Sequence, residues 1–213
     1  MILYYSPGAC SLVPHIALEE AEADYRGERV MLADGQHLTD DYRQINPHAR
    51  VPALDVGGQV ITENVAILNY IAHHWHAEGS VPLDDPRAAA RCNQLLGWFA
   101  SSVHIGFAQV WRAERFTDDE TVHGAIQSGG HQVLKRYFAE IEAMCGDGWA
   151  VPGHFTAADS YLITFFRWGR RIGNDMTAYP RWQALVARVL DRPAVERALA
   201  TEGLTRDDFK ARD

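Results

Sequence analysis

The chain has 213 residues, a formal net charge of −8 at pH 7, and 47% hydrophobic and 23% charged residues. This length allows one large domain or two small ones with a substantial apolar core, and the composition is ordinary for a globular protein. An acidic surface repels phosphate backbones, so we expect no nucleic-acid partner. No stretch is apolar over the length of a membrane span, so we expect no membrane partner either.

The cysteines and the first residues of the chain indicate its compartment. Cys10, Cys92 and Cys145 are odd in number and widely spaced, which fits a reduced cytoplasmic protein better than a disulfide framework. The start, MILYYSPGAC, has no basic region and is not a secretory signal. The histidines at 73–76 have no cysteine or carboxylate partner nearby, so we expect a polar helix end and no metal site.

The first part of the chain predicts a small α/β sandwich. Apolar runs, turn residues and helical periodicity give the order β-α-β-α-β-β-α. The expected elements are a strand at 2–5, a helix at 10–22, a strand at 27–32, a short helix at 39–46 capped by Thr39, a hairpin at 52–62 turning at Gly57-Gly58, and a helix from residue 63.

The second part of the chain predicts only helices. Residues 1–78 form the expected α/β domain, 79–86 a linker rich in turn formers, and 87–213 an all-helical domain. Helices are expected at 87–113, at 118–145, from residue 156, and near 180–190 and 193–202. Thr156 and Asp159 resemble a capping box, with Asp in place of the usual Glu. Arg167, Arg170 and Arg171 form the densest basic group, which we interpret as a solvated or ion-paired helix face.

Cys10 follows a Pro7-Gly8 turn at the point where a strand ends and a helix begins. A helix N-terminus favours an anion, and a thiol is a nucleophile only as the thiolate. Such a turn lets the backbone approach a ligand closely. We therefore expect the stretch to hold a sulfur, its own or that of a ligand, with a pKa for Cys10 below the usual ~8.5. The alternative is a small residue packed under the turn, since free cysteines are often buried.

Two further stretches suggest a peptide ligand. A cis Val51-Pro52 bond before the hairpin would leave the backbone of Val51 free to pair with an extended peptide. Glu63 and Asn64 lie between a strand and a helix, where the acid can hold an amine and the amide can hold a carboxylate. The alternative for this pair is ordinary helix capping by Thr62 or Asn64. Together, the three stretches indicate a ligand with a thiol, a peptide middle and an amino-acid end.

At this point the sequence resembles a glutathione S-transferase, most closely the bacterial, cysteine-containing beta class. The similar blocks are YYSPGACSLVPHIALEE, INPHARVPAL, TENVAILNYIA, SSVHIGF, HFTAADSYL and ERALATEGL, and they extend along nearly the whole chain. The resemblance implies a thioredoxin-like domain followed by a helical bundle. It also implies a cytoplasmic, homodimeric bacterial enzyme of detoxification, with glutathione as co-substrate and no metal.

The resemblance implies the catalytic group Cys10, His104 and Tyr5. Cys10 matches the class cysteine beside the glutathione sulfur, which can form a mixed disulfide with it. His104 matches the histidine that faces the sulfur from the first long helix, although a lone histidine on a helix is more often a packed or surface residue. Tyr5 matches an aromatic near the same pocket. Asp159 matches a buried capping aspartate with a folding role.

The implied glutathione-binding residues are Cys10, Leu32, Val51, Pro52, Glu63 and Asn64. Val51 matches the residue that pairs with the glutathione backbone, and Glu63 with Asn64 matches the pair that reads the γ-glutamyl end. Three positions depart from the class: Asn64 replaces Ser or Gly, Ile105 replaces a common lysine, and Gly97 replaces a common Asn. The last two remove a positive charge and a polar group from the expected helical wall of the pocket, which affects glutathione affinity.

Three functions are compatible with these residues. The first is a transferase that conjugates glutathione to small apolar electrophiles by positioning and activating its thiol. The second is a one-cysteine, glutathione-dependent thiol-disulfide oxidoreductase, since the chain has no CxxC motif. The third is a non-catalytic binding module on a transferase fold. The sequence does not identify the electrophile.

Overall fold

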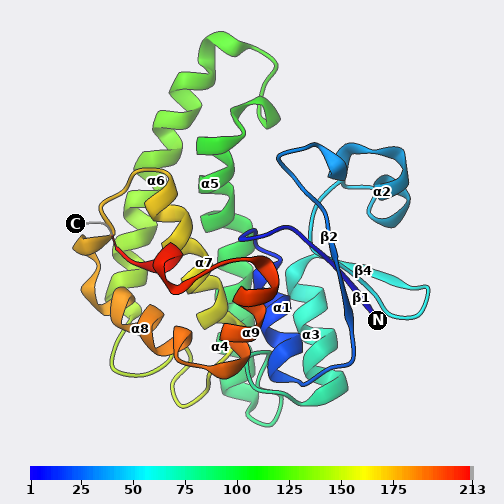
Figure 1. Ribbon diagram of the computed structural model, residues 1–213. Coiled ribbons are helices and arrows are strands. Elements are labelled where there is room, and N and C mark those ends of the chain that lie inside the picture. Colours follow the sequence, from blue (N-terminus) through cyan, green and yellow to red (C-terminus); the bar gives the residue numbers. More distant parts are fainter. Residues whose placement is uncertain (212–213) are drawn as a thin grey trace.

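The computed structural model describes residues 1–211 and contains an α/β part beside an all-helical part, as Figure 1 shows. A four-stranded mixed sheet in the order β2-β1-β3-β4 forms the α/β part. β1 runs parallel to β2 and antiparallel to β3, and β3 and β4 form a hairpin. The elements are β1 (Ile2–Tyr5), α1 (Leu12–Glu20), β2 (Arg26–Arg29), α2 (Asp40–Ile45), β3 (Ala53–Asp55), β4 (Val60–Thr62) and α3 (Asn64–Trp75). The predicted element order and thioredoxin-like fold are confirmed.

Local chemistry explains several of these elements. The side chain of Thr39 accepts a hydrogen bond from the N–H of Tyr42 at 3.3 Å and so caps α2, as predicted. Gly57 and Gly58 form the hairpin turn at φ 85° and 97°, a region that L side chains rarely adopt. Side chains of β1 alternate between the two faces of the sheet. Tyr5 is therefore buried in the main core with α1, whereas Tyr4 packs on the other face beside Tyr42 of α2.

The second strand differs from its predicted range of 27–32. β2 begins at Arg26 and ends at Arg29, at the edge of the sheet. The N–H of Val30 still donates to the carbonyl of Tyr5 at 2.7 Å, and then the chain leaves the sheet. Met31 and Leu32 line a cavity. A cavity wall and a buried strand both need apolar side chains, so hydrophobicity alone did not separate the two.

The helical part contains α4 (Pro86–Trp98), α5 (His104–Trp111), α6 (His123–Met144), α7 (Ala157–Arg171), α8 (Pro180–Leu190) and α9 (Pro193–Glu202). The predicted helix at 87–113 is helical from Pro86 to Trp111, and a π-helical turn at Phe99–Val103 lies within it between α4 and α5. The predicted helix at 118–145 begins later, at His123, after a short 3₁₀ turn at Glu120–Val122. Single π-helical turns occur frequently at functional sites.

Helix α7 forms the centre of the helical part and is buried along most of its length. The predicted capping box at its start is confirmed. Asp159 is fully buried and accepts hydrogen bonds from the N–H groups of Ala150 at 2.8 Å and Thr156 at 2.9 Å. Burial raises the pKa of the Asp159 carboxyl to about 6.

The two parts of the molecule share one core, because α1 packs against both α7 and α9. Between α3 and α4, in the region predicted as a linker, the chain forms neither helix nor strand. The N–H of Gly79 donates to the carbonyl of Phe155, and the N–H of Ala157 to that of Ser80, both at 3.1 Å. The domain boundaries 1–78 and 87–213 remain predictions, and residues 212–213 lie outside the described residues. Within residues 1–211, no helix combines the length and apolar character needed to cross a membrane.

Candidate functional site

Two cavities lie between the α/β part and the helical part. The larger has a volume of about 460 Å³ and the smaller about 230 Å³. Both are lined by Cys10, Arg50, Val51, His104, Ala108 and Arg115. The larger cavity extends to Leu32, His37, Trp111, Arg112, Trp168 and Arg171. The smaller cavity extends to Asn46, Pro52, Glu63, Asn64, Ile105 and Tyr161.

One face of α5 forms the helical wall of the larger cavity. His104, Phe107, Ala108 and Trp111 line it, and their spacing of three and four residues places them along a single helix face; Arg112, the residue after α5, lines the same cavity. His104 is the first residue of α5 and directly follows the π-helical turn. The wider turn therefore precedes one of the residues that line both cavities, in accordance with the usual location of such turns.

Cys10 lies two residues before α1 and is 8% exposed. Its Sγ donates a hydrogen bond to the carbonyl of Val51 at 3.5 Å. Burial raises the pKa of the Cys10 thiol to about 12, because the charged thiolate is poorly solvated there. The prediction of a lowered pKa is therefore wrong: burial outweighs the lowering by a backbone hydrogen bond and by the charge of Arg50. Cys10 is a neutral thiol that lines both cavities.

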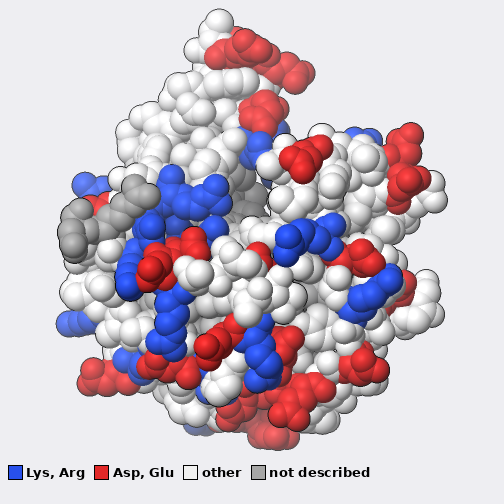
Figure 2. Space-filling view, in the orientation of Figure 1, with Lys and Arg blue, Asp and Glu red and all other residues white. Residues whose placement is uncertain are grey.

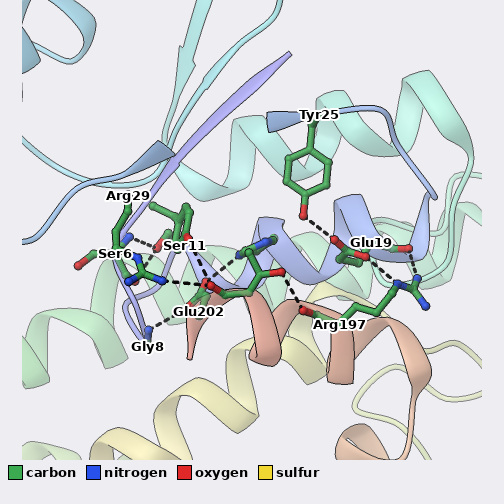
Figure 3. Close-up of polar contacts among 11 residues, drawn as sticks. Ser6, Gly8, Ser11, Glu19, Tyr25, Arg29, Arg197 and Glu202 are labelled. Atoms are coloured by element: carbon green, nitrogen blue, oxygen red, sulfur yellow. Dashed lines mark hydrogen bonds and ion pairs between the residues drawn. The ribbon is translucent and has the colours of Figure 1, made fainter. Parts of the chain in front are cut away.

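The turn before Cys10 is fixed by residues from the end of the chain. Gly8 has φ +66°, and its N–H donates to Glu202 of α9 at 2.6 Å. The other carboxylate oxygen of Glu202 lies 2.9 Å from Nδ1 of His15, on α1. The indole N–H of Trp168 donates to the carbonyl of Gly8 at 2.8 Å. Figure 3 shows Glu202 between the Ser6–Gly8 turn and α1, so α9 and α7 together hold the position of the Cys10 turn.

The three arginines near the end of α7 do not together form the solvated or ion-paired face that we expected. Arg167 is 9% exposed and donates to the carbonyl of Gly8 at 3.3 Å. Arg170 donates to the carbonyls of Asp207 and Lys210 at the C-terminal end. Arg171 lines the larger cavity. The prediction holds for Arg171, which is exposed, and is wrong for Arg167, because α7 is central in the fold and most of its last turns meet neighbouring segments.

His104 packs edge-on against Trp168, with ring centroids 5.2 Å apart. Burial lowers the pKa of His104 to about 4, and the nearby Arg115 and Arg50 contribute. The imidazole is therefore neutral at pH 7 and offers one N–H donor and one nitrogen acceptor. It can hydrogen-bond a thiol or thiolate but brings no positive charge.

The loop that precedes β3 carries Val51 and Pro52. The bond between them is cis, as expected. The carbonyl of Arg50, one residue earlier, accepts hydrogen bonds from Tyr42 Oη at 2.8 Å and Asn46 Nδ2 at 2.7 Å. These bonds connect the loop to α2 and hold Val51 beside Cys10, where both residues line the two cavities.

Glu63 and Asn64 both line the smaller cavity. Glu63 is exposed and has φ +68°, an unfavourable conformation for a non-glycine residue that is often found at functional sites. Asn64 is buried, and its amide nitrogen donates to the carbonyl of Cys10 at 3.0 Å and to Tyr161 Oη at 2.7 Å. Its nitrogen is thus engaged within the protein. Within residues 1–211, Asn64 Oδ1 has no hydrogen-bond partner.

Neither interpretation of this pair holds fully. The N-cap of α3 is Glu63, which makes no side-chain capping bond, so the alternative of capping by Thr62 or Asn64 is not supported. The amide nitrogen of Asn64 does not point to a free position where it could bind a carboxylate, because it is already bonded to Cys10 and Tyr161. The backbone start of α3 remains suitable for an anion, and the Glu63 carboxylate for an amine.

Some of the other predicted residues line a cavity and some do not. Leu32 lines the larger cavity, and Pro52 and Ile105 line the smaller. Tyr5 lines neither: it is 4% exposed, and its hydroxyl donates to the carbonyl of Thr201 at 3.4 Å. The period of two in β1 turns Tyr5 toward α1 and α9, so the geometry gives it no catalytic contact. Gly97 is exposed and lies outside both cavities, so its departure from the class does not change the pocket wall.

Sequence reasoning missed the charged and hydroxyl groups around the cavities. Arg50 and Arg115 line both cavities, Arg112 lines the larger one, and Tyr161 lines the smaller one. Arg112 and Arg115 directly follow α5, and Tyr161 lies in the block HFTAADSYL, but no periodicity indicates where a side chain beyond a helix end will point. Within residues 1–211, no group of three His, Cys, Asp or Glu side chains is arranged to hold a metal ion.

Comparisons with known proteins match both parts of the chain. The family profile described as "Glutathione S-transferase, N-terminal domain" matches residues 1–73, and "Glutathione S-transferase, C-terminal domain" matches residues 107–188. The glutathione S-transferase GstA of Escherichia coli O157:H7 is 33% identical over 214 residues, which cover 96% of this chain and 100% of the relative.

Solved structures agree with the sequence matches. A glutathione transferase homologue from Sulfitobacter with bound glutathione superposes with a TM-score of 0.88 and 28% identity, over 96% of this chain and 98% of that one. The beta class glutathione S-transferase of Sphingomonas chungbukensis has a TM-score of 0.82 and 32% identity, over 96% of this chain and 100% of that one. Both similarities extend over the two parts of the molecule.

Proposed function

The chain belongs to the glutathione S-transferase family and is a glutathione transferase, and we propose that it adds glutathione to a small electrophile beside Cys10 and His104. The observation that carries this proposal is their convergence. Cys10 precedes the first helix of the α/β part and His104 begins a helix of the helical part, yet both line the same two cavities. A reacting sulfur held between them meets one donor from each part.

The smaller cavity is the proposed site for most of the glutathione molecule. Its lining contains five of the six residues that the family resemblance implies, namely Cys10, Val51, Pro52, Glu63 and Asn64. Glu63 can bind the γ-glutamyl ammonium, and the start of α3 can bind the adjacent carboxylate. Arg50 and Arg115 can compensate the negative charge of the peptide. Leu32 lies in the larger cavity, where the glycyl end would extend.

The proposed chemistry activates the glutathione thiol by hydrogen bonding. His104 is neutral, so an imidazole N–H can donate to the thiolate as negative charge develops on the sulfur. The Cys10 thiol stays protonated because of its raised pKa of about 12, and it supplies a second, weaker donor once its S–H turns from the carbonyl of Val51 to the bound sulfur. The thiolate attacks the electrophilic carbon, a carbon–sulfur bond forms, and the leaving group departs with its bonding electrons while the thiol proton passes to solvent.

The other two functions considered from the sequence are not favoured. Thiol-disulfide exchange requires Cys10 to attack as a thiolate, and its raised pKa of about 12 opposes this. A non-catalytic module does not require His104 and Cys10 to line a common cavity. The similar bacterial proteins described above are glutathione S-transferases that match the chain over nearly its whole length.

The test combines binding and catalysis. The protein should be retained on immobilised glutathione, be released by free glutathione, and catalyse conjugation of glutathione to 1-chloro-2,4-dinitrobenzene. Retention without conjugation of any aryl halide, together with rapid exchange of Cys10 with glutathione disulfide, would replace the transferase proposal by the oxidoreductase one. Absence of retention and of both activities would support a binding module.

We also propose that the protein is a cytoplasmic homodimer with a role in detoxification, as the family resemblance implies. Two-fold dimers are the commonest soluble homo-oligomers. Light scattering should give twice the mass of the 23.8 kDa chain at micromolar concentration. A monomer at that concentration contradicts this part of the proposal and leaves the transferase activity unaffected.

A further inference from the structure

The larger cavity is strongly basic although the protein is acidic. The whole chain has 28 Asp and Glu against 20 Lys and Arg residues, which gives its net charge of −8. The lining of the larger cavity contains four arginines and no aspartate or glutamate: Arg50, Arg112, Arg115 and Arg171. Figure 2 shows Lys and Arg side chains at the hollow between the α5–α6 hairpin and the α2 end of the molecule, with Asp and Glu side chains on the upper part of its rim. Such a concentration of one charge favours an anionic ligand.

These arginines are not explained by ion pairs. Within residues 1–211, the salt bridges that involve arginine use Arg26, Arg192, Arg197 and Arg206, none of which lines a cavity. Arg115 lies near both Arg50 and Arg112, and after burial these two charges lower its pKa further. Three like charges close together repel one another unless an anion lies between them.

Glutathione alone cannot pair with all of the arginines that line the larger cavity. It brings two carboxylates and one ammonium, and Glu63 in the smaller cavity is suited to the ammonium. Arg50 and Arg115 line both cavities and can serve glutathione, whereas Arg112 and Arg171 line only the larger one. The glycyl carboxylate would also reach the larger cavity, where Arg50 or Arg115 can bind it, so the charges of Arg112 and Arg171 are left over for the second substrate.

The surroundings of Arg112 suit a flat, unsaturated anion. Trp111 is 39% exposed, stacks on Phe107 with ring centroids 5.5 Å apart, and meets Trp168 edge-on at 5.4 Å. These rings give the larger cavity an aromatic wall next to the arginine. His37 is 9% exposed and lines the same cavity, and its Nδ1 has no hydrogen-bond partner within residues 1–211.

We propose that the preferred electrophile of this enzyme is an aromatic or conjugated carboxylic acid, whose carboxylate binds Arg112 with support from Arg115 while its ring lies against Trp111. This rests on the proposed transferase function and departs from the expectation of a purely apolar electrophile. A guanidinium binds a carboxylate with directional, charge-assisted hydrogen bonds, which an apolar electrophile cannot use. Arg112 is thereby a specificity-determining residue that does not contact the reacting sulfur.

A matched pair of substrates tests the proposal. In 4-chloro-3-nitrobenzoate and 4-chloro-3-nitrobenzamide the same reaction occurs: a carbon–sulfur bond forms, the carbon–chlorine bond breaks, chloride leaves with the bonding pair, and the thiol proton goes to solvent. The two differ mainly in charge. Each enzymatic kcat/KM is divided by the uncatalysed rate constant with glutathione, so intrinsic reactivity cancels.

We expect the native protein to favour the benzoate at least about fivefold by this measure, and the preference to fall with added salt. Arg112→Gln should lower kcat/KM for the benzoate about three- to tenfold and leave the KM for glutathione and the reaction of the benzamide nearly unchanged. Arg136→Gln, at an exposed arginine of α6 outside both cavities, is the matched control and should change nothing.

Two results overturn the proposal: an unchanged preference in Arg112→Gln, or a rise in the KM for glutathione as large as the loss on the benzoate. The second would assign Arg112 to a carboxylate of glutathione.

A binding measurement separates this proposal from the transferase function. Calorimetry compares unreactive 4-methyl-3-nitrobenzoate with its amide in the presence of S-methylglutathione. Tighter binding of the acid than of the amide, lost in Arg112→Gln, supports a carboxylate site at Arg112 even if no conjugation occurs. Conjugation of 1-chloro-2,4-dinitrobenzene without this preference refutes the carboxylate site and leaves the transferase function standing.

Discussion

The starts of α1 and α7 are two helix N-termini with opposite surroundings. At α7, Thr156 and Asp159 form a complete capping box, and Asp159 is fully buried. At α1, Ser11 makes no side-chain bond to the first turn, and Cys10 just before it lines two cavities. The start of α7 is closed by its own side chains, and the start of α1 opens onto space for a ligand.

The difference shows how polar groups divide between folding and function. The carboxylate oxygens of Asp159 bond within the protein, to Ala150 and Thr156, so removing it affects the fold. Around the α1 start, the protein leaves groups without internal partners, including Asn64 Oδ1 within residues 1–211. The arginines of the larger cavity line the same space as Cys10, just before α1. Substitutions there should change binding or turnover more than stability.

The largest effect is expected at the closed helix start. Asp159→Ala removes the capping box and leaves the N–H of Ala150 buried without a partner, so the free energy of unfolding should fall by about 3 kcal/mol. Urea unfolding measures this loss. The control is Asp85→Ala, at the exposed start of α4, where Asp85 accepts bonds from the N–H groups of Arg87 at 2.9 Å and Ala88 at 3.1 Å. Equal losses in the two variants would contradict the distinction between a buried and an exposed cap.

The pH dependence of Asp159 sharpens this test. Its folded-state pKa of about 6 lies above the unfolded value of about 3.9, so the folded state binds more protons between these values. Its titration therefore favours folding below about pH 4, and this contribution is lost as the pH rises through about 6. The native protein should have a larger free energy of unfolding than Asp159→Asn, and this difference should shrink as the pH rises between these two values. An advantage that grows with pH would show that burial does not dominate.

At the open helix start, the largest expected effect is on turnover. His104→Ala should lower kcat for 1-chloro-2,4-dinitrobenzene about 10²-fold and change the KM for glutathione much less, because the hydrogen bond strengthens as charge develops on sulfur. The folded-state pKa of about 4 keeps His104 neutral at higher pH, so its protonation should cause no loss of kcat between pH 7 and 5. Intact turnover in His104→Ala would make this histidine a packing residue of Trp168.

A smaller effect is expected in the reactivity of Cys10, which depends directly on the surroundings of its thiol. Cys10 should be alkylated before Cys92 and Cys145, which are 0% and 2% exposed and line neither cavity. Its rate near neutral pH should be at least about tenfold below that of a free cysteine, and should still be rising at pH 9, because little thiolate is present. Mass spectrometry across a pH series reports both. A plateau below pH 8 would restore the lowered pKa predicted from the sequence.

The smallest effect is expected at Ile105, which is 42% exposed and lines the smaller cavity. Ile105→Lys adds a positive charge near the proposed glutathione site and should tighten glutathione binding about two- to threefold, more at low salt than at high salt. The gain is modest because Arg50 and Arg115 already line this cavity. Calorimetry at two salt concentrations measures it. Weaker binding in the lysine variant would place the glutathione carboxylates elsewhere.

Local chemistry along the chain was sufficient to predict the element order, the Thr39 cap, the Gly57-Gly58 hairpin turn and the Thr156–Asp159 capping box. These features depend on residues close together in the chain, whose side-chain chemistry and backbone freedom act locally. The family blocks also indicated Cys10, Val51 and His104, which the fold brings to common cavities.

The charge and orientation of the site depend instead on tertiary packing. Burial reversed the expected pKa shift of Cys10, and the period of two in β1 turned Tyr5 away from the cavities. The π-helical turn before His104 and the position of Trp111 and Arg112 in the wall of the larger cavity have no signature in the sequence. Desolvation and the convergence of side chains require segments that are far apart in the chain, so both arise only when α1, α5 and α7 pack together.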